Sequence, residues 1–118
     1  MRLEGSFYNV VSSTPVEGGY VFDLVLAKDH PIYAGHFPGQ PVVPGMCTLT
    51  IVRECLGNIL EKKVMFSSVK ECKFLSALIP EEELSIVMHL MISGEDVSCV
   101  IEKGAEPVFK LKAKYTSI

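Results

Sequence analysis

Three stretches of the chain alternate between apolar and polar positions with a period of two. They cover residues 20–27, 84–92 and 109–115, and the last of them places lysines at 110, 112 and 114 on the face opposite its apolar residues. Such alternation, rich in β-branched and aromatic side chains, is typical of β-strands with one buried face. A further strand is expected over residues 64–74. Glycine-containing turns at 18–19, 94–96 and 104 predict antiparallel hairpins between neighbouring strands.

Only one segment has a helical period. Apolar residues recur there at spacings of three and four, which predicts a helix over residues 46–60. The stripe consists of Leu49, Val52, Leu56, Ile59 and Leu60. The element order is therefore two strands, a loop, one helix and about four more strands. One helix cannot cover both faces of a sheet, so we expect an α+β fold in which a curved antiparallel sheet wraps around the helix.

The 118 residues suggest one domain, residues 1–118. The uncovered sheet face or an edge strand of such a domain needs a partner, which predicts a homodimer or a higher assembly of dimers. The net charge of −3 gives no basic stripe for nucleic acid. The apolar run at residues 84–92 is too short to span a bilayer, and no apolar run follows the basic residue near the N-terminus. No membrane association is expected, and the cytoplasm is the predicted location. The four cysteines lack CxxC spacing, so no metal site is expected.

The segment before the helix, residues 30–45, concentrates proline and glycine. It holds four of the seven prolines and three of the nine glycines. Each X-Pro step excludes the helical region for the preceding residue, so the loop is expected to be extended and stiff. Gly45 stands at the start of the helix, where backbone N–H groups lack internal partners and carry partial positive charge. A thioester carbonyl could be polarised there, and His36 is a candidate base. The simpler interpretation is a rigid connector with a structural or solvated histidine.

The residues GHFPGQPVVPG, positions 35–45, resemble the signature GHFPGxPxxPG of the hotdog-fold β-hydroxyacyl-acyl-carrier-protein dehydratases. The stretch VKECKFLSALIPEEEL, positions 69–84, is also similar to that family. The resemblance implies the hotdog fold, a dimer with two active sites at the subunit interface, and hydro-lyase activity. The expected substrate is a 3-hydroxyacyl thioester of an acyl-carrier protein or of CoA, dehydrated to the trans-2-enoyl thioester. No cofactor is implied, because the thioester itself acidifies the α-proton.

By the same resemblance, His36 moves a proton at the α-carbon, the Gly45 N–H polarises the thioester carbonyl, and the Val42 carbonyl orients the histidine ring. An apolar tunnel would hold the acyl chain. The residues expected to bind substrate are Phe37, Val42, Pro44, Met46, Leu49 and Thr50.

The sequence departs from the family at one position. The family places a carboxylate five residues after the last glycine of the motif, and that position here is Thr50. Loss of a general acid typically costs about 10²–10⁴-fold in rate. Glu54 is the nearest replacement, one helical turn later and about 40° around the axis. We predict it as the acid, against the simpler interpretation of an ordinary helix-face carboxylate. His30 is expected to shape the loop entrance, and His89 to be a packed or partner-facing residue.

Three functions follow from these residues. The first is an active dehydratase or hydratase of fatty-acid or related acyl-chain biosynthesis that uses His36 with Glu54 or a bound water. The second is a catalytically impaired subunit that binds the acyl chain or carrier protein, with an active dehydratase as its possible partner. The third is an acyl thioesterase, which the dehydratase-type loop disfavours.

Overall fold

A computed structural model describes residues 2–35, 42–80 and 84–118. The residues outside these ranges include His36 and Phe37, so the roles predicted for these two lie outside the described part of the chain.

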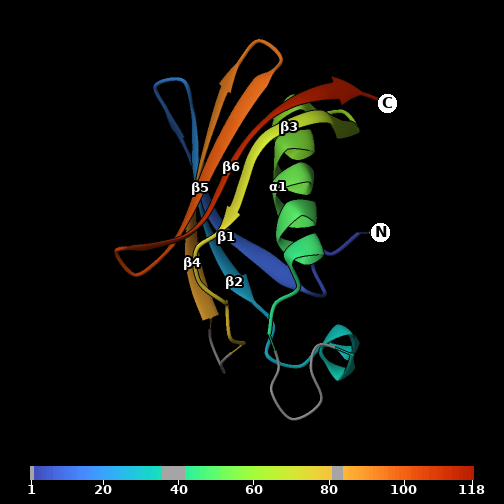
Figure 1. Cartoon of the computed structure of the whole chain (residues 1–118), viewed down its shortest axis with the longest axis vertical. Helices are drawn as coiled ribbons and strands as arrows, with labels where there is room; N and C mark the ends of the chain where they lie inside the picture. The colour runs from blue at the N-terminus through green and yellow to red at the C-terminus, as the bar shows by residue number, and fades with distance from the viewer. Residues whose placement is uncertain (1, 36–41, 81–83) are drawn as a thin grey trace.

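The described chain forms one antiparallel sheet and one long helix (Figure 1). Their order follows the prediction of two strands, a loop, a helix and four strands. The elements are β1 (Tyr8–Val16), β2 (Gly19–Leu26), the 3-10 helix η1 (Pro31–Ala34), α1 (Gly45–Leu60), β3 (Val64–Phe74), β4 (Leu84–Ser93), β5 (Asp96–Lys103) and β6 (Glu106–Ser117). The three predicted glycine turns join β1 to β2, β4 to β5 and β5 to β6, and the glycines at 18, 94 and 104 all have positive φ. Within the described ranges, no helix is long and apolar enough to cross a membrane.

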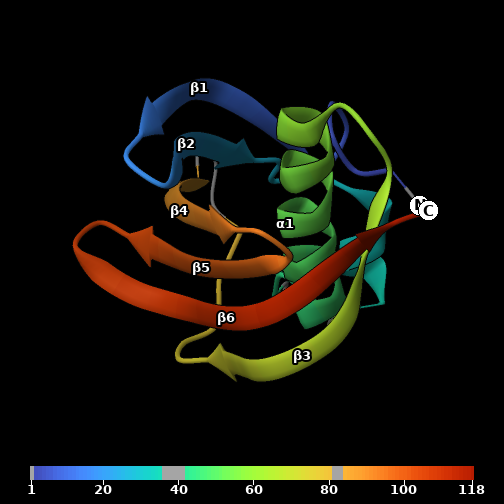
Figure 2. The ribbon, with the colours of Figure 1, turned by 90° about the horizontal axis from the view of Figure 1, so that it is seen from above.

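The sheet has the strand order β1-β2-β4-β5-β6-β3 and curves strongly around α1 (Figure 2). Register shifts that accompany this curvature lie at 10/12 in β1, at 66/68 and 69/71 in β3, and at 107/109 in β6, opposite residues 101/102 of β5. A bulge bends its strand and increases the local twist, which lets one sheet enclose a helix. This architecture, a curved antiparallel sheet around a central helix, is the hotdog fold, as predicted.

The helix buries a wider face than the stripe of five residues predicted. Val52 and Leu56 are fully buried, whereas Leu49, Ile59 and Leu60 are only partly buried. The burial extends to four further apolar side chains, Cys47, Ile51, Cys55 and Val43 just before the helix. The face is wider because the sheet covers one side of α1 and the segment of residues 3–8 covers another.

The strand β3 is an edge of the sheet and keeps apolar side chains in solvent. Met65, Val69 and Phe74 are each about half exposed, as are Leu75 and Ile79 after the strand ends. An edge strand with exposed apolar residues is a surface that proteins normally cover. The homodimer expected from the sequence stays a prediction.

The loop before α1 differs from the extended path that its prolines predict. Residues 31–34 form η1, and the φ of −143° at His30 satisfies the restriction that Pro31 imposes on it. Pro31 then starts the short helix, because its fixed φ suits a first helical position.

Candidate active site

A cavity of about 340 Å³ lies at the N-terminal end of α1, between the helix, the end of β3 and β6. Most of its lining is apolar. The lining residues are Val42, Val43, Gly45, Thr48, Phe74, Ser76, Ala77, Leu78, Val108 and Phe109. The backbone before the helix is fixed here by a hydrogen bond of 2.8 Å from the Val43 N–H to the Leu78 carbonyl. The cavity is apolar enough for an acyl chain, and the hydroxyls of Thr48 and Ser76 are its side-chain polar groups.

Gly45, the first residue of α1, lines this cavity, and no side chain caps its end of the helix. Pro44 occupies the N-cap position, where it makes no side-chain hydrogen bond. Within the described residues, the Gly45 N–H has no hydrogen-bond acceptor. An unpaired N–H at a helix N-terminus is a donor with partial positive charge. The Gly45 N–H can therefore donate a hydrogen bond to an oxygen atom of a ligand.

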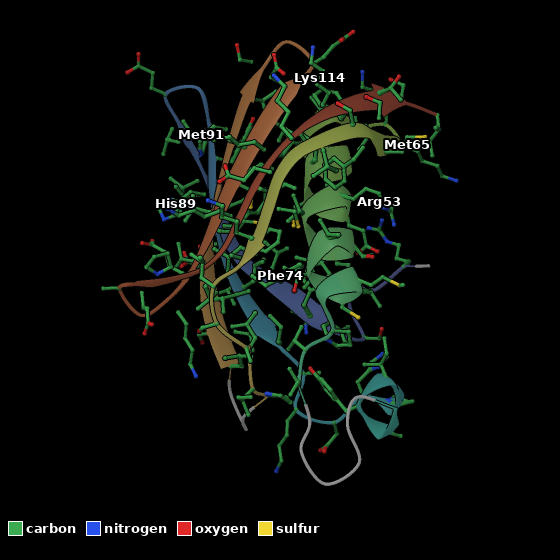
Figure 3. The ribbon with its side chains drawn as sticks, in the orientation of Figure 1. Arg53, Met65, Phe74, His89, Met91 and Lys114 are labelled. Atoms are coloured by element: carbon green, nitrogen blue, oxygen red, sulfur yellow. The ribbon has the colours of Figure 1, made fainter. Side chains whose placement is uncertain are left out.

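Gly45 also leaves room for an aromatic ring. A Cβ added at Gly45 would lie 2.8 Å from the Phe74 ring, closer than real Cβ contacts come. Phe74 packs against Phe109 with ring centroids 5.1 Å apart, and about half of its surface remains exposed. Figure 3 shows Phe74 at the end of β3 beside the first turn of α1. Glycine thus allows the close approach of the Phe74 ring here, a contact that the sequence alone did not indicate.

The predicted substrate-binding residues fall into two groups. Val42 lines the cavity, as does Gly45, which was predicted as a catalytic residue, and Pro44 directly precedes Gly45 as the N-cap of α1. Met46 is 70% exposed and Leu49 packs partly against the core, and neither lines the cavity in a single subunit.

Thr50, at the position where the sequence resemblance led us to expect a carboxylate, is nearly buried. Its hydroxyl donates a hydrogen bond of 2.9 Å to the Met46 carbonyl, one turn earlier in the same helix. This hydroxyl is therefore engaged by its own backbone and does not replace a carboxylic acid.

Glu54 has contacts that do not support the predicted role of general acid. Only 4% of its surface is exposed, and it does not line the cavity at Gly45. Its carboxylate accepts hydrogen bonds from the Leu3 N–H (2.7 Å), the Glu4 N–H (2.9 Å) and the Tyr8 hydroxyl (3.0 Å). Helix geometry placed Glu54 one turn from position 50, but it could not reveal partners about fifty residues earlier in the chain.

The surroundings of Glu54 keep its neighbours protonated. Burial raises the pKa of the Tyr8 hydroxyl well above its ordinary value, and the nearby Cys55 and Glu54 raise it further. Burial likewise raises the pKa of the Cys55 thiol to about 12. Tyr8 thus stays protonated at neutral pH and donates a hydrogen bond to the Glu54 carboxylate.

The two described histidines occupy different places. The Nδ1 atom of His30 accepts a hydrogen bond of 3.2 Å from the Ile32 N–H and so caps η1, which agrees with its predicted place at the loop entrance. The Nε2 atom of His89 lies 2.7 Å from Glu102 Oε1. His89 lies on the side of the sheet away from α1 (Figure 3).

Sequence reasoning missed the part of the cavity that β3 and β6 supply. Phe74 lies directly opposite Phe109 in the antiparallel register of these strands. The period-two pattern places each residue on a strand face, but the pairing of strands 35 residues apart is decided by the whole sheet. Part of the missed lining, residues 74–78, falls within the second stretch that resembles the dehydratases.

The hotdog fold, the apolar cavity at the helix N-terminus and the GHFPGQPVVPG motif together define a dehydratase-type hotdog protein. The family model of the ApeI-like proteins, described as ApeI dehydratase, matches residues 13–109. The chain belongs to this ApeI-like dehydratase family.

Curated relatives carry a related name. The chain is 29% identical over 91 residues to the 3-hydroxyacyl-(acyl-carrier-protein) dehydratase FabZ of Ehrlichia canis (strain Jake), with 69% of this chain and 61% of that protein covered. It is 36% identical over 67 residues to the FabZ of Paramagnetospirillum magneticum, with 49% and 42% covered. The chain thus spans about three fifths or less of the length of these relatives.

Two solved structures share the fold. One is the dehydratase heterocomplex ApeI:P from Xenorhabdus doucetiae, with a TM-score of 0.78 and 20% identity over 90% of this chain and 95% of that chain. The other is an uncharacterized protein from Erwinia carotovora subsp. atroseptica, with a TM-score of 0.65 and 25% identity over 91% of each chain.

Proposed function

We propose that this protein removes water from a 3-hydroxyacyl thioester to give the trans-2-enoyl thioester, with His36 as the base at the α-carbon. The Gly45 N–H binds the thioester oxygen and stabilises the negative charge that develops on it. The Val42 carbonyl orients the histidine ring. The substrate is carried by an acyl-carrier protein or by CoA.

The observation that carries this proposal is the Gly45 N–H, which has no acceptor among the described residues, beside an apolar cavity and at the end of a complete GHFPGxPxxPG motif. Removing one oxyanion-binding donor typically costs about 10²–10³-fold in rate, so a donor at this position is a large contribution. Membership of the ApeI-like dehydratase family and the names of the curated relatives support the same reaction class.

The proposed mechanism also requires a group that protonates the leaving hydroxyl. Glu54 is committed to three hydrogen bonds at residues 3–8, so we do not assign it this role. We propose that a water molecule, or a carboxylate of a partner subunit, supplies the proton. A water delivers it more slowly than a positioned carboxylic acid, which predicts slow turnover for the chain alone.

A second candidate function is an acyl- or carrier-binding subunit that completes the site of an active dehydratase. The threonine at position 50 favours it, because this side chain cannot act as an acid. The half-exposed apolar residues of β3 provide an edge on which a related subunit could pair. The structural neighbour from Xenorhabdus doucetiae is described as a heterocomplex, which supports the idea of such a pairing here.

The test is a thioester assay with the purified chain and 3-hydroxyacyl substrates on carrier protein and on CoA. Appearance of the enoyl thioester, lost in His36→Ala, supports the dehydratase. Saturable binding of the acyl carrier without turnover supports the binding subunit. Release of free thiol without enoyl product identifies a thioesterase and contradicts both.

A further inference from the structure

A second cavity, which we call the outer cavity, has a volume of about 450 Å³. It shares no lining residue with the cavity at Gly45. Three of its residues form one row across the sheet, because Met91 in β4 lies opposite Ser98 in β5, and Ser98 lies opposite Lys112 in β6. The residues of the outer cavity used below are Gly18, Lys70, Met91, Asp96, Ser98 and Lys112.

The alternation of side chains along the strands shows that this row faces away from the core. Leu90, Cys99 and Leu111 are each one position away from a residue of the row, and all three are buried in the core. Successive side chains of a strand point to opposite faces of the sheet, so the row points outward. Figure 3 accordingly shows Met91 on the side of the sheet away from α1. The outer cavity is therefore open to solvent and separate from the interior of the fold.

The hollow arises because a long side chain lies over two glycines. A Cβ added at Gly19 would come within 2.9 Å of the Met91 Sδ atom, and one added at Gly18 within 3.4 Å of the Met91 Cε atom. The Met91 side chain thus extends over the turn between β1 and β2. Ser98, its neighbour on β5, is too small to fill the space on the other side. The sheet surface between Met91 and Lys112 is left uncovered.

Two lysines supply positive charge on the β3 and β6 side of the outer cavity. Lys70 is exposed and has no hydrogen bond or ion pair with any residue in the ranges 2–35, 42–80 and 84–118. The Lys112 Nζ atom lies 3.9 Å from Glu71 Oε2, whereas the Lys73 Nζ atom lies 2.9 Å from Glu71 Oε1. Glu71 is thus bound mainly by Lys73. The ammonium groups of Lys70 and Lys112 are available to an anion.

The charges around the outer cavity suit a single anionic group. Asp96 lines the cavity on the β5 side, opposite Lys114 in the strand register. Its carboxylate repels any further negative charge of a ligand. A nucleic acid or an anionic membrane surface is instead recognised by several cationic side chains that act together. One small anion held by two lysines fits this distribution better than a polyanion.

The rest of the lining is mostly apolar, as ligand pockets generally are. Such pockets have volumes of about 300–1,000 Å³ and a few polar groups that orient the ligand. Met91 and the methylene groups of the lysines provide apolar surface beside the two ammonium groups. We infer that the outer cavity binds a linear carboxylate with an apolar chain. The carboxylate lies between Lys70 and Lys112, and the chain lies over Ser98 against Met91. The inference does not depend on the proposed dehydratase reaction.

The methionines of the chain allow a direct test by NMR, with the methyl groups labelled and decanoate as the probe. The Met91 signal should shift and saturate as decanoate is added at low salt. Met65, which is 45% exposed, and the fully buried Met88 are internal controls whose signals should stay in place. Decan-1-ol, which has the same chain without the charge, should bind about three- to tenfold more weakly.

Variants of exposed residues locate the two parts of the ligand. Lys112→Gln should weaken decanoate binding about three- to tenfold. Lys110→Gln is the matched control, because Lys110 is also exposed on the outer face of β6 but does not line the cavity, and it should change the affinity less than about twofold. Ser98→Leu fills the uncovered space and should abolish the Met91 shift.

Four results would overturn the inference. Equal shifts of Met65 and Met91 would show adhesion of the chain to any apolar surface. A shift of Met46, next to Gly45, without one of Met91 would place the chain in the other cavity. No shift of Met91 at millimolar decanoate would exclude the site. Equal losses of affinity in Lys112→Gln and Lys110→Gln would exclude the assigned place of the carboxylate.

Discussion

Thr50 and Glu54 stand one turn apart on α1, both are nearly buried, and their polar groups do different things. The Thr50 hydroxyl is satisfied within its own helix. The Glu54 carboxylate instead reaches out of the helix to two backbone N–H groups and a tyrosine hydroxyl. The helix thus carries a carboxylate in a structural position, whereas position 50, where the sequence resemblance led us to expect a carboxylate, has a threonine. A carboxylate in the right region of a sequence is therefore weak support for a catalytic role until its partners are known.

Removal of the Glu54 carboxylate is the most direct test of this difference between Thr50 and Glu54. Glu54→Ala removes the carboxylate acceptor of the buried Leu3 N–H, the part-buried Glu4 N–H and the buried Tyr8 hydroxyl, so the free energy of unfolding should fall by about 3 kcal/mol or more. Chemical denaturation measures the change. Thr50→Ala is the matched variant, and its cost should be below about 1 kcal/mol, because the hydroxyl only bonds its own helix. Equal losses in the two variants would contradict the distinction.

The opposite change adds the missing acid. Thr50→Glu should raise the rate of dehydration by about 10- to 100-fold, within the contribution of a positioned general acid. Initial rates of enoyl thioester formation measure the gain. Thr50→Gln is the control, since its side chain has the same length but no acidic proton. A similar gain in both variants would show that a change of shape, and not an acid, is responsible.

A substitution at Gly45 tests the proposed role of its N–H as hydrogen-bond donor to the thioester oxygen. In Gly45→Ala, the new methyl group must displace the Phe74 ring, whose end lies 2.8 Å from the added Cβ. Because the half-exposed ring can move, we expect stability to change by less than about 1.5 kcal/mol. The rate should fall by about tenfold as the donor is obstructed. The double variant Gly45→Ala with Phe74→Leu gives the methyl room, and its rate should recover unless the glycine itself is needed for the ligand to approach.

The smallest expected effect concerns the reactivity of two thiols, that of Cys55 next to Glu54 in the chain and that of Cys72 in β3. Burial holds the pKa of Cys55 at about 12, above its ordinary value of 9.0, whereas Cys72 is exposed. At pH 8, a thiol reagent should modify Cys72 first and leave Cys55 unreacted, as mass spectrometry can show. Above pH 9, the unfolded chain releases the Cys55 proton and the folded chain keeps it, so stability should fall as the pH rises toward 12. Rapid labelling of Cys55 at pH 8 would mean that the packing around Glu54 opens readily.

The sequence was sufficient for the fold because its local signals agree with each other. Period-two strands, glycine turns and a single helical segment allow few arrangements, and the sheet around one helix is the one observed. The motif likewise located Gly45 and Val42 at a cavity. The sequence alone could not predict the contacts of Glu54 or the contribution of Phe74 to the cavity lining. Both depend on contacts between segments far apart in the chain. A carboxylate on a helix looks the same in the sequence whether it faces a substrate or a backbone turn.

The central claim is that His36 and the Gly45 N–H at the start of α1 catalyse the dehydration without a carboxylate at position 50. The most direct measurement follows enoyl thioester formation from a 3-hydroxyacyl thioester on its carrier protein, for the wild type and for His36→Ala. The account predicts slow turnover by the wild type that falls by about 10²-fold or more in the variant. Equal rates in the two proteins would contradict the claim.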